Sequence, residues 1–106
     1  MDISFYSGDS RNLIINVVDE NNNPINLTES VIEWVLISNG LVLLKKSIDK
    51  GITLSKPAEG QFKIIIDSSD TDSLSGTYNH LARVTTTDGE SSIVISGTIL
   101  VEKSLI

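Results

Sequence analysis

Apolar and polar residues alternate along most of the chain, in short runs that end at turn-forming residues. Successive side chains of a β-strand point to opposite faces, so this period of two predicts strands with one buried face. The predicted strands are residues 3–6, 12–19, 31–38, 41–47, 51–54, 61–67, 78–87 and 91–102. No internal repeat or low-complexity tract interrupts them, and the whole chain, 1–106, is predicted to be one domain.

The alternation also predicts which residues face the core. These residues are Leu13, Ile15 and Val17, then Ile32, Trp34 and Leu36, then Phe62, Ile64 and Ile66, and finally Ile93, Ile95, Ile99 and Val101. Trp34, the only tryptophan, is interpreted as the central plug of this core. The alternative, a tryptophan that stacks on a ligand, needs neighbouring exposed rings, and the chain contains few aromatic residues.

Two dipeptides predict tight connections between strands. Asn39-Gly40 readily adopts the positive φ angles of a type I′ turn, and Asp88-Gly89 is a second hairpin signal. Residues 68–74 are the only segment that suits a helical turn, and Ser69 or Asp70 is the expected cap. In the alternative interpretation of this segment, Asp67, Asp70 and Asp72 offer oxygens to Ca²⁺, but their spacing does not match an EF-hand loop.

The motif Leu74-x-Gly76-x-Tyr78 resembles the tyrosine corner of Greek-key sandwiches, in which a tyrosine hydroxyl bonds to backbone a few residues upstream. This is an architectural feature and predicts no ligand. His80 is in step with Ala82 and Val84, which predicts a position on the inner face or at its edge. A single histidine without an orienting carboxylate and a nucleophile is interpreted as a hydrogen-bonded structural residue.

Composition narrows the fold. The chain has 15 Ile and 8 Val but only 2 Ala, which favours strands and argues against an all-helical protein. Seven or eight short strands with frequent turns are typical of an antiparallel, Ig-like β-sandwich, and this is the predicted fold class.

The absence of cysteine excludes disulfides, thiolate metal sites and a cysteine nucleophile. The chain has one histidine, and no combination of nucleophile, base and acid can be assembled from its sequence, so we expect a non-enzymatic protein without a cofactor or metal.

The net charge and the sorting signals of the chain limit the kinds of partner that we expect. The net charge of −6 repels phosphate backbones, and the one basic doublet, Lys45-Lys46, is too small to form a groove, so nucleic-acid binding is not expected. The chain starts with Met1-Asp2 and shows neither a signal peptide nor a membrane span.

One run departs from alternation. Leu41, Val42, Leu43 and Leu44 are apolar on both faces of a single strand, although a strand with one wet face should alternate. Either this strand is covered on both sides within the chain, or its outer face meets a partner. Leu105 and Ile106 at the end of the chain pose the same question, so these six residues are the candidate assembly surface.

Several turn and core motifs together resemble a known family. They are Phe5-x-x-Gly8-Asp9-Ser10, Asp19 with Asn23-Pro24-Ile25-Asn26-Leu27-Thr28, Gly51-Ile52, Gly60-x-Phe62, Thr71-x-x-Leu74-x-Gly76-x-Tyr78, Asp88-Gly89 and Gly97. In this order they resemble the Ig-like virion domains of tailed phages, most closely the N-terminal domain of baseplate upper proteins. Two positions depart mildly from that pattern, since Ser10 stands for the usual Thr and Asn23 for Gly.

The resemblance implies a bacteriophage virion protein of the tail, neck, baseplate or capsid surface, made in the host cytoplasm. It implies contacts with other virion proteins and homo-oligomers within a symmetric assembly. The fibre or receptor-binding regions of baseplate upper proteins are not in this sequence, which favours a small structural or adaptor subunit. The alternative from another class is an Ig- or fibronectin-like adhesion or carbohydrate-binding module, which predicts a secretion signal and exposed aromatic residues.

Overall fold

Eight strands form one continuous sheet in the computed structural model, which describes residues 1–106. The order across the sheet is β1-β8-β7-β3-β4-β5-β6-β2. The strands are β1 (Ile3–Tyr6), β2 (Arg11–Asn16), β3 (Val31–Ser38), β4 (Leu41–Ile48), β5 (Gly51–Lys56), β6 (Gln61–Ile66), β7 (Gly76–Thr85) and β8 (Ser91–Glu102). Two single turns of helix, η1 (Pro57–Glu59) and α1 (Ser68–Thr71), complete the fold.

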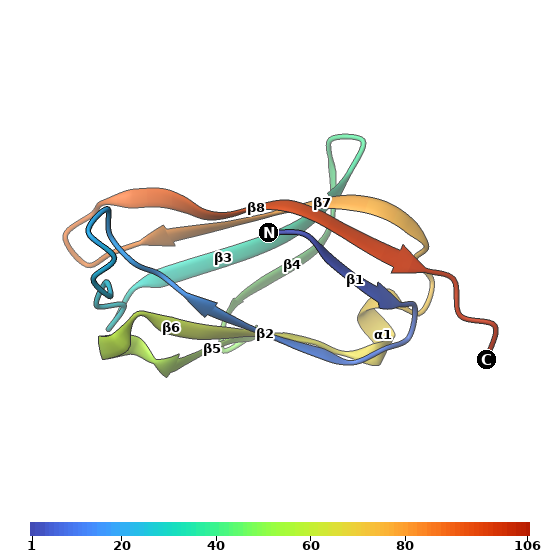
Figure 1. Cartoon of the computed structure of the whole chain (residues 1–106), viewed down its shortest axis with the longest axis horizontal. Helices are drawn as coiled ribbons and strands as arrows, with labels where there is room; N and C mark the ends of the chain where they lie inside the picture. The colour runs from blue at the N-terminus through green and yellow to red at the C-terminus, as the bar shows by residue number, and fades with distance from the viewer.

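The sheet curls into a half-barrel around its core. Figure 1 shows β3, β7 and β8 on one side and β2, β5 and β6 on the other, with β4 crossing between them. The chain changes sides at the tight bend between β4 and β5, where Asp49 has a φ of 64° and Gly51 a φ of 99°. The two edge strands, β1 and β2, follow each other in sequence but lie at opposite ends of the strand order.

The prediction of an all-β fold is confirmed, whereas the sheet is mixed rather than antiparallel throughout. β1 pairs with β8 in parallel, and β4 pairs with β5 in parallel through Ser47 and Ile48 alone. The first parallel pair forms because the chain enters and leaves the sheet in the same direction. The second is confined to two residue pairs beside the bend, where Ser47 and Lys50 exchange backbone hydrogen bonds, so the sheet is mixed and continuous.

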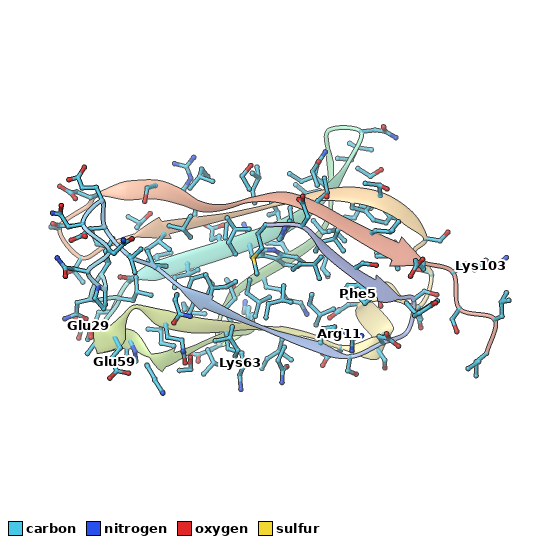
Figure 2. The ribbon with its side chains drawn as sticks, viewed as in Figure 1. Phe5, Arg11, Glu29, Glu59, Lys63 and Lys103 are labelled. Atoms are coloured by element: carbon cyan, nitrogen blue, oxygen red, sulfur yellow. The ribbon has the colours of Figure 1, made fainter.

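The core follows the alternation closely. Seventeen buried apolar residues form one cluster, with Trp34, Phe62 and Ile64 fully inaccessible to solvent. The predicted inward faces of β2, β3 and β6 are all buried, while charged side chains such as those of Glu59 and Lys63 point away from the molecule (Figure 2). Burial of this face stabilises each strand more than its intrinsic propensity does.

Ile93 is an exception to the predicted face. A bulge in the β7–β8 pair sets Ala82 opposite Ile95 and Arg83 opposite Ile93, so that Val94 is the extra residue. Because one inserted residue shifts the alternation, Ile93 lies on the outer face and is 45% exposed. The prediction that Ile93 shares the buried face with Ile95 is therefore wrong.

The second strand is shorter than its apolar pattern predicts. Pairing ends where Asn16 meets Gln61, the first residue of β6, so the predicted strand 12–19 stops three residues early. Beyond this point Val17 donates its N–H to the carbonyl of Gly60, and Val18 makes an isolated bridge with Pro24. The partner strand, rather than the local sequence, sets this boundary.

Candidate assembly surface

The hairpin between β3 and β4 projects from the body of the molecule (Figure 1). At its tip Asn39 has a φ of 52° and Gly40 a φ of 78°, the positive pair that a type I′ turn requires. This confirms the predicted turn. The right-handed twist that such a turn allows keeps both strands paired up to the tip, where Ser38 faces Leu41.

The apolar run behind this turn is exposed. Leu41, Val42 and Leu43 are 68%, 57% and 46% exposed, respectively, whereas Leu44 is half-buried and packs on the core. A bulge sets Leu36 opposite Leu44 and Ile37 opposite Val42, so Leu43 has no partner across the pair. Of the two alternatives for this run, burial within the chain is thus excluded for three of its four residues.

The same segment has an unpaired backbone edge. β4 bonds to β3 along its length, but its other edge meets β5 only at Ser47 and Ile48. Residues 41–46 therefore present one free row of N–H and C=O groups beside the exposed apolar side chains. An edge of this kind is a template for pairing with another strand.

Leu105 and Ile106 lie elsewhere. They follow the end of β8 on a tail that extends away from the body, and Figure 1 shows this tail apart from the β3–β4 hairpin. Leu105 is 94% exposed, and the tail borders a shallow hollow with Tyr6 and Asp9. The structure thus divides the six predicted assembly residues into two separate patches.

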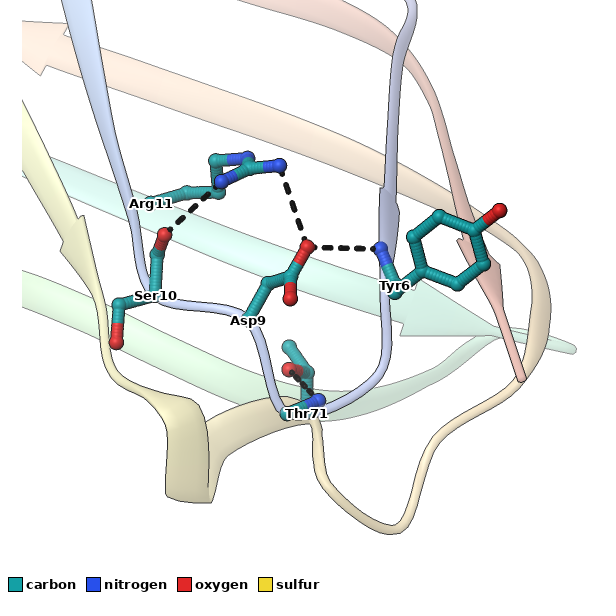
Figure 3. A network of polar contacts seen from close by, with 6 residues as sticks. Tyr6, Asp9, Ser10, Arg11 and Thr71 are labelled. Carbon is teal, nitrogen blue, oxygen red and sulfur yellow. Dashed lines mark hydrogen bonds and ion pairs between the residues drawn. The ribbon is translucent and has the colours of Figure 1, made fainter. Parts of the chain in front are cut away.

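The turn between β1 and β2 closes the end of the half-barrel near this tail. Asp9 Oδ2 accepts hydrogen bonds from the N–H of Tyr6 and from the Arg11 guanidinium, both at 3.2 Å, and so joins the two edge strands (Figure 3). The Gly8 N–H donates to Thr71 Oγ1 at 3.1 Å, which ties this turn to α1. The Gly8-Asp9-Ser10 motif thus links β1, β2 and α1.

Trp34 and His80 form a buried polar contact at the centre of the core. Trp34 Nε1–H donates to His80 Nδ1 at 3.1 Å, and neither residue is accessible to solvent. Because Nδ1 accepts, the ring proton is on Nε2, which donates to the Met1 carbonyl at 2.8 Å. Burial lowers the pKa of His80, against the opposing effect of the bond to Met1. Both residues are buried and hydrogen-bonded as expected, and Trp34 is not accessible for stacking on a ligand.

Met1 can reach this histidine because β8 has no side chain at Gly97. Gly97 pairs with His80, and a Cβ atom at this position would overlap the backbone of Met1. Asp2, the next residue, accepts hydrogen bonds from the N–H and the hydroxyl of Thr98. These bonds hold the pKa of Asp2 below its usual value. The start of the chain is thereby laid along β8.

Lys46 is a largely buried lysine that we did not identify as a core residue from the sequence. Its side chain is 10% exposed and its Nζ lies 2.7 Å from Asp70 Oδ2. Gly51 makes room for it, since a Cβ atom there would overlap the aliphatic part of Lys46. A signal for this position was available in the sequence, because Lys46 has the same parity as Leu44 and Ile48 and alternation therefore places it inside.

The acidic segment forms the predicted capped turn. Its cap is Asp67 rather than Ser69 or Asp70, since α1 begins at Ser68. Asp70 Oδ2 accepts the Asp67 N–H at 2.8 Å and also binds Lys46, so this carboxylate completes the start of the helix. No group of three acidic or histidine side chains converges here or elsewhere. The arrangement fits a cap and an ion pair.

The tyrosine corner is confirmed in its geometry. Tyr78 Oη donates to the Ser75 carbonyl at 2.9 Å and accepts the Ser75 N–H at 3.1 Å. Leu74 packs on the core beside it, and Gly76, with a φ of 115°, begins β7. This corner orients the entry of the chain into the central strands.

Two exposed carboxylates have hydrogen-bond partners that favour their charged form. The pKa of Glu33 is lowered by its bond to Lys45, whose Nζ lies 2.8 Å from Glu33 Oε2. The pKa of Asp88 is lowered by the Thr86 hydroxyl and by the Glu90 N–H in the β7–β8 hairpin. In this hairpin Gly89 supplies the positive φ of 88°, so the second predicted hairpin is also confirmed.

Comparison of the chain with protein-family models, with curated proteins and with solved structures finds no match. None of the helical segments has the length and apolar character needed to cross a membrane.

Proposed function

We propose that the protein is a non-enzymatic structural subunit of a bacteriophage virion, in its tail, neck, baseplate or capsid surface. In this proposal it acts through contacts with other virion proteins and with further copies of itself. The observation that carries the proposal is the β3–β4 hairpin, which joins three exposed apolar side chains to an unpaired strand edge. The phage assignment itself rests on the sequence motifs.

The finer fold is part of this proposal. We regard the curled mixed sheet as an Ig-like sandwich whose two sides stay connected through β4 and β5. The tyrosine corner at the start of β7 supports this interpretation, because it is a feature of Greek-key sandwiches.

The arrangement of polar side chains suits a structural role. The only histidine has both ring nitrogens engaged, by Trp34 and by Met1, and is buried. The carboxylate nearest to a buried cation, Asp70, is held by Lys46 and by backbone. These side chains are engaged within the fold, whereas the apolar side chains of the hairpin are exposed and available for recognition.

Docking of the hairpin would combine two kinds of contact. A strand of a partner protein pairs with the free edge of residues 41–46, and pockets of that partner receive Leu41 and Leu43. Backbone bonds then supply affinity and the apolar side chains supply specificity. In a symmetric ring, repetition of this contact strengthens a weak single interaction.

Incorporation into particles tests this proposal. In phage particles purified from the strain that encodes the chain, we expect the wild-type protein at a fixed ratio to the other particle proteins. The variant Leu41→Ser/Leu43→Ser removes apolar surface from the hairpin without touching the core, and we expect its incorporation to fall at least tenfold. Absence of the wild-type protein from particles would refute the virion role.

The matched control is Ile14→Ser/Val18→Ser. Ile14 and Val18 are 48% and 46% exposed, similar to Leu43, but lie on β2 and just beyond it. We expect this variant to be incorporated like the wild type. If both double variants are incorporated equally well, the hairpin is not the docking element.

A further inference from the structure

The outer face of β3 and β7 carries a second set of residues that the core does not use. Glu33 and Val35 of β3 alternate with the buried Trp34, and Leu81 and Arg83 of β7 alternate with the buried Ala82. In the register of these strands Val35 lies beside Leu81 and Glu33 beside Arg83. The same four residues, with Ile93 of β8, line one shallow hollow on this face.

The hollow combines an apolar centre with separated charges. Val35 and Leu81 are half-buried, and Ile93 is 45% exposed because the β7–β8 bulge turns it outward. Glu33 pairs with Lys45 of β4, whereas Arg83 is exposed and forms neither an ion pair nor a side-chain hydrogen bond. An exposed, unpaired guanidinium next to an apolar patch is available for a carboxylate from outside the molecule.

We propose that this face binds the same face of a second copy of the chain, around a two-fold axis that runs between β3 and β7 and parallel to them. The inference deepens the proposed function, on which it rests, by naming one partner and the surface that meets it. Its first support is geometric. A two-fold axis along the strands exchanges β3 with β7 and keeps each residue at the same height along the strands.

The register then makes the face self-complementary. Residues that are neighbours across β3 and β7 face each other between copies, so Val35 packs on Leu81 of the second copy. Likewise Arg83 faces Glu33 of the second copy, and the reciprocal pair forms on the other side of the axis. Each of the two Arg83 guanidinium groups in the dimer therefore gains one carboxylate, while apolar side chains meet at the centre.

A two-fold axis at right angles to the strands does not bring these opposite charges and apolar residues together. With the axis at right angles to the strands and centred on Val35, β3 of one copy lies over β3 of the other, and Glu33 meets Ile37. Centred on Glu33, the same axis opposes two carboxylates. Only the axis parallel to β3 and β7 pairs opposite charges and apolar residues together, which favours a second copy in this one orientation.

The contact is concentrated near the axis. Two twisted sheets pack face to face at about −30°, so their central residues touch while their corners diverge. The long-range repulsion between two copies of charge −6 is screened at physiological salt, where the Debye length is about 8 Å.

Charge reversal tests the proposal by sedimentation velocity at physiological salt over a concentration series. We expect the wild-type chain to dimerise. Glu33→Arg and Arg83→Glu each place like charges opposite one another in a homodimer, and we expect each to weaken dimerisation at least tenfold. An equimolar mixture of the two variants should dimerise again, since each introduced charge then faces its opposite in the other chain.

The recovery in the mixture cannot arise from changes within one chain, such as loss of the Glu33–Lys45 ion pair. Matched controls are Glu59→Arg and Lys63→Glu, whose side chains point outward on the opposite side of the molecule (Figure 2). We expect both controls to dimerise like the wild type. A wild-type chain that stays monomeric, or single variants that dimerise normally, would overturn the proposal, as would a mixture that stays monomeric.

These outcomes are separable from those of the proposed function. If the Leu41→Ser/Leu43→Ser variant still dimerises but fails to enter particles, both proposals stand. A monomeric wild-type chain that enters particles through its hairpin contradicts only the two-fold contact. A dimer that is absent from particles contradicts only the virion role.

Discussion

The interior of the half-barrel contains two polar contacts, which satisfy buried polar side chains in different ways. One is the neutral contact of Trp34, His80 and the Met1 carbonyl, and the other is the charged contact of Lys46 with Asp70. The first lies between β3, β7 and the start of the chain. The second joins β4 to the single turn of α1.

Depth explains the difference. His80 is fully buried and stays neutral, with each ring nitrogen matched to one partner. Lys46 and Asp70 keep 10% and 16% of their side chains exposed, at the rim of the core. Removing a full charge from water costs several kcal/mol, so the ion pair lies where some hydration remains and where Asp70 can also bind backbone. Neutral polar groups can lie deeper.

The largest effect is expected from breaking the charged contact on one side. Asp70→Ala leaves the Lys46 ammonium without its carboxylate and removes an acceptor from the Asp67 N–H. We expect the free energy of unfolding to fall by about 3 kcal/mol, the cost of an uncompensated charge near the protein interior. Urea unfolding followed by the fluorescence of Trp34 measures this change.

Lys46→Met sharpens the same test, because it keeps the length of the side chain and removes its charge. We expect a loss of only about 1 kcal/mol, since the Asp70 carboxylate retains the Asp67 N–H and some water. The double variant Lys46→Met/Asp70→Ala should be more stable than Asp70→Ala alone. A double variant that is less stable than either single variant would contradict this account.

The neutral contact should respond to pH. The unfolded chain protonates His80 near its ordinary pKa of 6.5, whereas the folded chain keeps it neutral to lower pH. Between these two values the unfolded state binds more protons, so stability falls as the pH falls below about 7. The slope approaches at most about 1.4 kcal/mol per pH unit, until the folded histidine also becomes protonated.

Urea unfolding between pH 7 and pH 5 measures this slope, at values above the range in which the carboxylates titrate. Protonation places a hydrogen on Nδ1, which then opposes the Trp34 N–H. The matched variant is His80→Gln, which cannot titrate, and we expect its stability to change little over the same range. An equal slope in the variant and the wild type would assign the dependence to other groups.

The smallest effect is expected at the tyrosine corner, where the contact lies at the half-exposed edge of the fold. Tyr78→Phe removes the hydroxyl that binds the Ser75 backbone, and we expect a loss of about 1 kcal/mol. Tyr6→Phe is the control, because Tyr6 is 53% exposed and its hydroxyl has no partner within the chain. A loss below about 0.5 kcal/mol for Tyr78→Phe, typical of surface substitutions, would show that the corner does not stabilise the fold.

Local patterns predicted the elements well where one face of a strand is buried by its neighbours. The alternation of Phe62, Ile64 and Ile66 and the turn at Asn39-Gly40 each identify their element, because period and turn chemistry are local properties. The outward position of Ile93 and the buried position of Lys46 depend instead on contacts that are distant in the sequence. A bulge turns Ile93 to the outer face, and Lys46 pairs with the carboxylate of Asp70, which is 24 residues away in the sequence.

The local pattern also predicted part of the candidate assembly surface. The break in alternation at Leu41–Leu44 indicates either burial on both faces of the strand or an outer face that meets a partner. Three of the four residues are exposed in the structure. Whether Leu105 and Ile106 belong to the same patch depends on where the tail leaves β8, which no local pattern encodes. The outer face of Val35, Leu81 and Arg83 depends on the cross-strand register, which alternation within each strand does not determine.

By itself the sequence determined an all-β chain, its turns, the inward position of Trp34 and the hydrogen bond of Tyr78 to nearby upstream backbone, since these depend on residues close to one another in the chain. Tertiary structure alone decided that the sheet is mixed and curls into a half-barrel, that Met1 completes the hydrogen bonds of His80, and that Asp70 neutralises Lys46. The physical reason is that strand direction, bulges and buried polar partners are selected by long-range pairing, in which each group must find a partner wherever the fold can bring one.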